Sequence, residues 1–241
     1  MSFPVTRHSV VRDLASADPG VRAAAYDALA RSYWRPVYLY IRHRSTRDVE
    51  DARDLTQEFF ARAFEREYLE RYDPARARFR TFVRTCLDGF LANQAQAAAR
   101  LKRGGGFAIA SVDFAEADAD LLLRAPLDDA DPERWFHREW VRGLFAGALE
   151  TLRRRCDAAG HARAFTVFRR YDVDDSTPRP TYADVAGELG LRVTDVTNEL
   201  AWARRAFRKI VLETLRRVCA TDEEFRAEAR DLFGVDPDDA V

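Results

Sequence analysis

The chain has 241 residues, 47% of them hydrophobic, so it is long and apolar enough to bury a core and is not a wholly disordered protein. Its formal net charge of −1 argues by itself neither for nor against a nucleic-acid partner. No segment approaches the roughly 20 consecutive apolar residues of a membrane span, and the first residues lack the apolar run of a signal peptide. We therefore expect a cytoplasmic protein of one or two domains without a membrane partner.

Almost every periodic stretch has the spacing of an α-helix, and strand-like alternation is scarce. The first predicted helix covers residues 23–44, with a bend at Pro36. The second is "DARDLTQEFFARAFER", residues 51–66. A third covers residues 79–103 and ends at a run of three glycines, which is a strong stop signal.

The predicted helix at 51–66 has two contrasting faces. An apolar stripe runs along one side, and the opposite side carries most of the polar residues: Asp51, Asp54, Gln57, Glu58 and Glu65. One interpretation is a solvated face above a buried stripe. The other is a surface that docks on a partner of opposite charge.

Charge is segregated along the chain. Seven basic residues and one acid, Asp88, lie between Arg76 and Arg103, whereas eight acids and one base lie between Ser111 and Glu133. Such blocks suggest that one stretch faces a polyanion and that the other avoids or imitates it. We interpret the acidic stretch, residues 107–132, as a linker between two domains.

Helical spacing resumes at residues 132–155 and is broken by "DVDDSTPRP". Residues 181–211 then have the spacing of a helix-turn-helix, with Thr181 and Asp184 at the start of the first helix. Gly190 stands where the chain must turn, with a positive φ expected. An ordinary helical hairpin is the alternative. In the tail, Phe225, Ala229 and Leu232 form one side of an amphipathic helix that covers the second domain or contacts a regulator.

Metal, cofactor and catalytic patterns are not found in the sequence. The three cysteines form no Cys-x-x-Cys pair, and the four histidines complete no metal-ligand spacing, so we expect reduced thiols, no metal and no cofactor. The triple glycine is not followed by Lys-Ser or Lys-Thr at the start of a helix, which argues against a nucleotide-binding loop. With no catalytic triad either, we expect a protein that is not an enzyme.

Two motifs in one order give the chain a family resemblance. "DARDLTQEFFARAF" with the basic aromatic helix after it, followed beyond the linker by "YADVAGELGLRVTDVTNELAWARRAFRKIV", resembles bacterial RNA polymerase sigma factors of the extracytoplasmic-function (ECF) group. The resemblance implies an all-α fold of two helical domains joined by an acidic linker. The implied parts are a region 2-like domain (1–106), the linker (107–132), a region 4-like helix-turn-helix domain (133–220) and a helical tail (221–241).

The resemblance also implies interaction sites. In the family, the helix equivalent to 51–66 docks on the clamp helices of the largest subunit of core RNA polymerase, which here would be contacted by Asp54, Leu55, Gln57 and Glu58. The next helix and its preceding loop melt the minus-ten promoter element, and the loop captures a flipped base. The matching residues are Arg76, Arg78, Arg80, Arg84, Asn93, Arg100, Lys102 and Arg103. The helix-turn-helix would hold the minus-thirty-five element through Thr194, Thr197, Asn198, Ala201, Arg204 and Arg205.

Several positions depart from the family pattern. Asp88-Gly89 stand where Arg-Asn is common, Arg192 where a capping serine is common, and Glu199 where a base is common. Base preferences at the two promoter elements therefore do not transfer. The sequence assigns no role to the insertion around residues 153–180 or to the tail, and it predicts neither the promoter, the regulon nor the inducing signal.

The expected protein is a sigma factor, monomeric when free, with core RNA polymerase and promoter DNA as partners. An anti-sigma protein or a regulatory kinase is a candidate regulator. Two other functions are compatible with parts of the sequence. A stand-alone helix-turn-helix regulator leaves the polar face of 51–66 unexplained, and a helical protein-binding adaptor leaves the arginine-rich stretch 76–103 unexplained.

Overall fold

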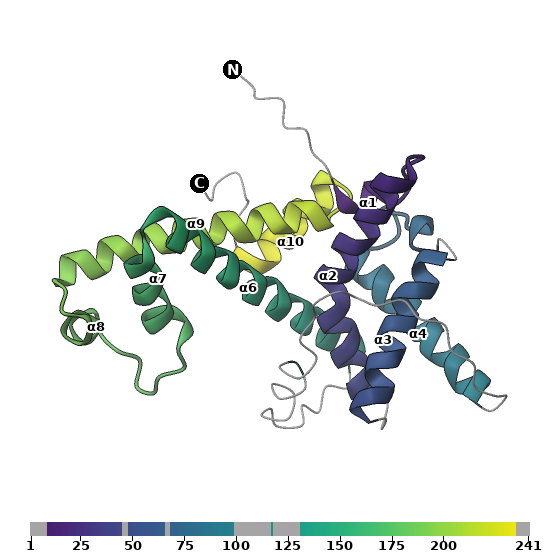
Figure 1. The fold of residues 1–241 in the computed structure, drawn as a ribbon, viewed down its shortest axis with the longest axis horizontal. Helices are drawn as coiled ribbons and strands as arrows, with labels where there is room; N and C mark the ends of the chain where they lie inside the picture. Colours follow the sequence, from purple (N-terminus) through teal and green to yellow (C-terminus); the bar gives the residue numbers. More distant parts are fainter. Residues whose placement is uncertain (1–8, 45–47, 66–67, 99–116, 118–130, 235–241) are drawn as a thin grey trace, which may run out of the picture. The chain divides into compact units, whose positions relative to one another are not determined.

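Every regular element in the described part of the chain is helical, as expected (Figure 1). A computed structural model describes residues 9–44, 48–65, 68–98, 117 and 131–234. The elements are α1 (Val10–Asp13), α2 (Pro19–Arg44), α3 (Val49–Glu65), a 3-10 helix η1 (Tyr68–Arg71), α4 (Phe79–Ala98), α6 (Pro132–Ala159), α7 (Ala162–Phe168), a π-helical turn η2 (Arg169–Val173), α8 (Tyr182–Leu189), α9 (Val193–Val218) and α10 (Asp222–Phe233). None of these helices is long and apolar enough to cross a membrane.

The chain divides into two compact units, at positions that differ from the domain boundaries expected from the sequence. The first unit comprises Met1–Gly143 and Leu215–Leu232, and the second comprises Leu144–Thr214 and Phe233–Val241. The three boundaries fall inside α6, α9 and α10. Most of the acidic stretch that was expected to be a linker lies outside the described residues.

The core of the first unit is aromatic. Tyr33, Tyr38 and Tyr40 of α2 are fully buried, together with Phe59 of α3 and Phe79 of α4. The helices α2 and α3 lie side by side (Figure 1), so the apolar stripe predicted for residues 51–66 meets the tyrosines of α2. Burial of such large side chains supplies most of the stabilisation of a bundle. The predicted bend at Pro36 does not end the helix, since α2 runs through it.

The tail helix α10 belongs to the first unit instead of covering the second. Its apolar side packs as predicted, with Phe225 and Ala229 buried and Leu232 half-buried. Two of its acidic residues, Glu224 and Glu228, are buried as well. Buried carboxylates need hydrogen-bond or ionic partners, and those partners lie on α4.

In the second unit, α8 and α9 are joined by a short turn, and the start and end signals expected for α8 are confirmed. The Oγ1 atom of Thr181 accepts the backbone N–H of Asp184 at 3.2 Å, and Asp184 in turn accepts the N–H of Thr181 at 2.7 Å, which makes a capping box. Gly190 ends α8 with a φ of 64°. Val196 and Leu200 of α9 are buried, as predicted for its inner face.

Candidate nucleic-acid and protein interfaces

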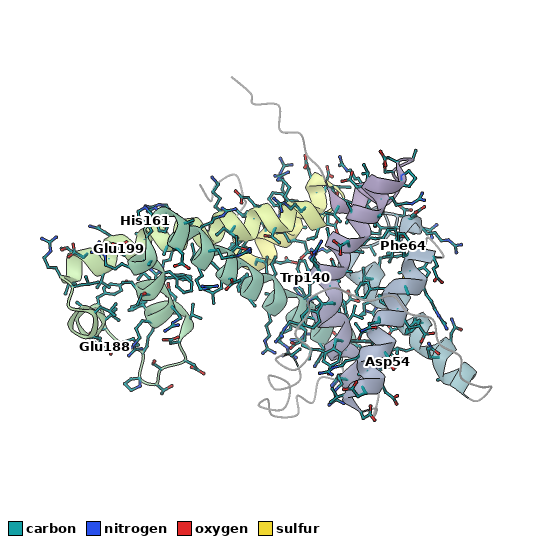
Figure 2. The ribbon with its side chains drawn as sticks, viewed as in Figure 1. Asp54, Phe64, Trp140, His161, Glu188 and Glu199 are labelled. Atoms are coloured by element: carbon teal, nitrogen blue, oxygen red, sulfur yellow. The ribbon has the colours of Figure 1, made fainter. Side chains whose placement is uncertain are left out.

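The polar face of α3 presents one free acid among the four residues expected to contact a partner. Asp54 is exposed and has no hydrogen bond or ion pair within the described ranges (Figure 2). Gln57 is half-buried. Leu55 is 5% exposed, so it lies in the core of the bundle. Glu58 forms an ion pair with Arg62 and accepts a hydrogen bond from the side-chain amide of Gln94, which connects α3 to α4.

The arginines at the start of α4 are held by acids of α10. The Nε of Arg80 donates to Glu228 at 2.7 Å, and Arg80 is 8% exposed. Arg78 pairs with Asp231 and lies 3.4 Å from Glu228. These two side chains were expected to bind DNA, and the structure uses them to attach the tail helix. Glu224, Glu228 and Asp231 follow the i, i+4, i+7 spacing of one helix face, so their common position on α10 could be read from the sequence.

Glu224 completes this junction at the first turn of α4. Its Oε1 accepts the backbone N–H of Phe79 at 2.6 Å, and its Oε2 accepts the N–H of Ala220 at 2.8 Å. The first backbone N–H groups of a helix have no partner within the helix, so a carboxylate placed there satisfies a donor and interacts favourably with the helix dipole. Since the first turn of α4 has no acid of its own, the tail supplies it.

The other residues predicted to bind DNA in the first unit are spread along α4 and the loop before it. The side chain of Arg76 is 86% exposed and lies 3.3 Å from Asp73. Arg84 forms ion pairs with Asp88 and Glu133, and Asn93 is exposed. Arg100, Lys102 and Arg103 lie outside the described residues.

Asp88, which departs from the family pattern, is engaged inside the protein. The hydroxyl of Tyr40 donates to its Oδ1 at 2.7 Å, and Arg84 donates to its Oδ2 at 2.5 Å. The carboxylate therefore satisfies a buried phenol and a guanidinium. These contacts give the acid that departs from the family pattern a role inside the first unit.

The contact between Tyr40 and Asp88 predicts a loss of stability in alkali. Burial, with the Asp88 hydrogen bond and charge, raises the pKa of Tyr40 from 10.0 to about 12. Because the folded-state pKa is the higher one, this stabilisation is complete below pH 10 and is lost as the pH rises through 12. Urea unfolding at pH 9, 10 and 11 should show that Tyr40→Phe removes a pH-dependent loss of about 1 kcal/mol over this range. Parallel pH profiles for the two proteins would contradict the assignment.

A pocket opens on the first unit between α3, η1 and α4. The pocket is open to solvent and has a volume of about 320 Å³. Its lining combines aromatic rings, guanidinium groups and one amide, from Arg62, Tyr68, Arg71, Phe82, Cys86, Gly89, Phe90 and Asn93. Planar apolar walls beside cations and an amide suit an unpaired base and its phosphate. Of these lining residues, only Asn93 is among the DNA-binding residues predicted from the sequence, and Arg62, Tyr68 and Arg71 are not. The arginines and tyrosines of "EREYLERY" could have indicated a candidate surface with aromatic rings and positive charge.

Gly89 of α4 is one of the residues that line this pocket. An added Cβ atom would meet nothing within 4 Å, and the residue lies within α4. We expect Gly89→Ala to raise the free energy of unfolding by about 0.5–1 kcal/mol, because alanine has the higher helix propensity. Gly147→Ala in α6, also with open space around the Cβ position, should stabilise similarly without touching the pocket. Denaturant unfolding of both variants checks this, and a destabilised Gly89→Ala would contradict it.

The outer face of α9 is exposed where the sequence predicts DNA contacts. Thr194, Thr197, Asn198, Ala201, Arg204 and Arg205 are all exposed. Thr197 donates its hydroxyl to the carbonyl of Thr194 at 3.0 Å, whereas Arg204 is held by Asp172 at 2.7 Å. The side chains of the helix are therefore available to a ligand without rearrangement of its backbone.

The two acids on this helix are paired with neighbouring arginines. Glu199, which departs from the family pattern, accepts from Arg163 of α7 at 2.7 Å, and its side chain is only 16% exposed (Figure 2). Asp195 accepts from the guanidinium of Arg192 at 2.8 Å and from its backbone N–H at 3.4 Å. Asp195, the third residue of α9, thus satisfies the backbone N–H of Arg192 just before the helix, which is one half of a capping box. These pairs lower the repulsion that unpaired acids would exert on a phosphate.

The thiols are not arranged for redox or metal chemistry. Cys86 is half-buried, Cys156 and Cys219 are buried, and none of them forms a disulfide. Burial raises the pKa of Cys86 to about 11, so the thiol is protonated at neutral pH. Within the ranges that the structure describes, no group of three or more His, Cys, Asp or Glu side chains could hold a metal ion.

Comparison with known proteins identifies one segment. Residues 29–101 match the family model of sigma-70 region 2. The match covers less than a third of the chain and spans α2, α3, η1 and α4, where the polar face of α3 and the aromatic pocket lie. It supports a sigma factor of the sigma-70 family. Comparisons with curated proteins and with solved structures gave no significant match.

Proposed function

We propose that this protein is a sigma factor of the ECF group, which binds core RNA polymerase and directs promoter recognition and melting. The observation that carries the proposal is the match of residues 29–101 to sigma-70 region 2, because that segment contains both candidate interfaces of the first unit. Catalysis would belong to the polymerase, and the protein itself would be neither an enzyme nor a carrier of a cofactor. Its place of action would be the cytoplasm.

Polymerase binding is assigned to the part of the polar face of α3 that lies around Asp54, Leu55, Gln57 and Glu58, and not to its C-terminal end at Glu65. Asp54 is its exposed, unpaired acid, and Gln57 is the neighbouring amide. A basic surface on the clamp helices of the largest subunit would be its complement. Leu55 would contribute by packing the helix from inside, because its side chain is buried. Glu58 would contribute by fixing α3 to α4 through Gln94.

Melting of the minus-ten element is assigned to the pocket between α3, η1 and α4. Phe82 and Tyr68 offer rings for an unpaired base, and Arg71, which is exposed, offers positive charge for its phosphate. Arg62 lines the same pocket, but its charge is shared with Glu58. Asn93 is exposed at the same pocket and offers an amide donor and acceptor. Stacking accepts any base, so these contacts favour a melted strand over a duplex without fixing its sequence.

Binding of the minus-thirty-five element is assigned to the exposed face of α9. Asn198 has the amide geometry that pairs with an adenine edge, and Arg205 is exposed about two helical turns later and can contact the DNA backbone. The capping box and the left-handed Gly190 fix α8 against this helix. Glu199 is paired with Arg163, and Asp195 is paired with Arg192. These ion pairs support the assignment, because they neutralise the two acids and reduce their repulsion of a DNA phosphate.

The test is binding of the purified full chain to bacterial core RNA polymerase, followed by open-complex formation on promoters selected from a random library. We expect a stoichiometric complex and protection of a melted region by the holoenzyme. A folded monomer that binds no cognate core enzyme would overturn the proposal. Dimers on palindromic duplexes would then favour a stand-alone regulator.

A further inference from the structure

Arg204 is the one arginine on the predicted DNA-binding face whose guanidinium is held by two parallel hydrogen bonds to an acid far away in the sequence. Its Nε donates to Oδ2 of Asp172 at 2.7 Å, and its Nη2 donates to Oδ1 at 2.8 Å. Asp172 lies in the π-helical turn η2, within the insertion that sequence reasoning left without a role. The insertion therefore reaches a residue of α9.

The turn that carries Asp172 is itself fixed. Arg170 donates to both carboxylate oxygens of Glu188 on α8, at 2.7 and 2.8 Å (Figure 2). Arg179, beyond the turn, donates to Oδ1 of Asp172 at 2.7 Å. With support from both sides, the side chain of Asp172 is 18% exposed. A π-helical turn inside a helical region often marks a functional position.

The contact with Asp172 uses two of the five N–H donors of the Arg204 guanidinium, one on Nε and one on Nη2. The ring of Tyr171 lies 5.6 Å from Cζ of Arg204. The side chain of Tyr182 is a further hydrogen-bond partner of this guanidinium, and the side chain of Arg204 is 46% exposed. The N–H donors that remain can bind an acceptor such as a phosphate oxygen or the N7 or O6 atom of guanine.

Asp172 does not cancel the whole positive charge of its two arginine partners. Its single carboxylate is shared by Arg204 and Arg179, so the three groups together keep a formal charge of +1. A cluster that remains cationic still attracts a polyanion. A guanidinium held in one orientation also loses less conformational entropy when it binds.

We propose that Asp172 is a positioning residue, which orients the remaining N–H donors of Arg204 toward acceptors on duplex DNA. The inference rests on the proposed function of α9 and adds to it a role for the insertion. The opposite role, in which Asp172 masks Arg204 from DNA, predicts an opposite sign: removal of the carboxylate would then strengthen binding.

The test uses the full chain with core polymerase and a duplex enriched from a random pool by the wild-type holoenzyme. Asp172→Asn, Arg204→Ala, the double variant and the control Asp174→Asn are compared, with thermal unfolding to establish that each is folded. Asp174 is a neighbouring exposed acid whose closest arginine is Arg169, at 3.8 Å. We expect about 5- to 10-fold weaker binding for Asp172→Asn, about 10-fold or more for Arg204→Ala, and no further loss in the double variant.

Two further measurements separate the outcomes. If Arg204→Ala lowers the slope of log affinity against log salt concentration equally for all DNA sequences, Arg204 contacts a phosphate. If Arg204→Ala instead removes the preference for guanine at one position of the site, Arg204 contacts a base. Unchanged or tighter binding by Asp172→Asn, or additive losses in the double variant, would overturn the positioning role. A wild-type holoenzyme that enriches no duplex would instead overturn the proposed function, and the inference with it.

Discussion

Replacement of Asp54 by arginine is expected to weaken binding to core RNA polymerase by at least ~30-fold, or about 2 kcal/mol, while the fold is unchanged. Asp54 is exposed and has no partner in the described part of the chain, so its replacement breaks no internal contact. A reversed charge would face the basic surface that the acid is proposed to meet. Fluorescence titration of labelled protein with core enzyme measures the affinity.

Glu65→Arg is the matched control for this experiment. Glu65 is also an exposed acid of α3, three helical turns from Asp54, and its replacement makes the same change in net charge. A specific contact predicts near wild-type affinity for Glu65→Arg. Equal losses in both variants would indicate a general electrostatic effect, and no loss in Asp54→Arg would remove this face from the proposed interface. Glu58 is a poorer probe, because its reversal also breaks the contacts with Arg62 and Gln94.

Arg80→Ala is expected to lower the free energy of unfolding by about 3–5 kcal/mol. The side chains of Arg80 and Glu228 are 10% and 2% exposed, so truncation leaves a buried carboxylate without its closest cation. The guanidinium also lies 5.9 Å from the centre of the Trp140 ring, and that contact is lost as well. Urea unfolding followed by circular dichroism measures the change.

Arg78→Ala provides the comparison, because Arg78 pairs with the same helix from a more exposed position. The side chains of Arg78 and Asp231 are 33% and 43% exposed, so solvent screens their interaction and the expected cost is about 0–1 kcal/mol. If Arg80→Ala were as stable as Arg78→Ala, the contact with Glu228 would not be holding α10 in place. Arg80 would then return to the group of residues available for DNA.

Periodicity was sufficient to predict the helices. The stretches 23–44, 51–66 and 132–155 became α2, α3 and α6, with ends displaced by a few residues. Local signals also predicted details, because the cap at Thr181 and the positive φ of Gly190 depend on neighbouring residues alone. Such features follow from sequence since their partners lie within one or two turns of the same helix.

Pairings over long sequence separations could not be predicted in this way. Helical patterns assign acids to a solvated face, so Glu224 and Glu228 looked like surface residues, although their partners lie on α4, almost 150 positions earlier. The same limit applied to Asp88 and Glu199, whose contacts with Tyr40 and Arg163 are visible only in three dimensions. A count of charges along the chain therefore overestimated the free arginines of the first unit.

The ribosome synthesises α10 long after helices α1 to α4 of the first unit, to which α10 also belongs. Residues 215–232 complete the first unit but are translated after the whole of Leu144–Thr214. At about 5–20 residues per second, the segment that pairs with Arg80 emerges roughly seven to thirty seconds after α4. Until then α4 lacks the carboxylate at its first turn, and the first unit lacks the buried side chain of Phe225. A nascent chain on the ribosome would thus carry an unfinished first unit, without the acids that α10 contributes to α4.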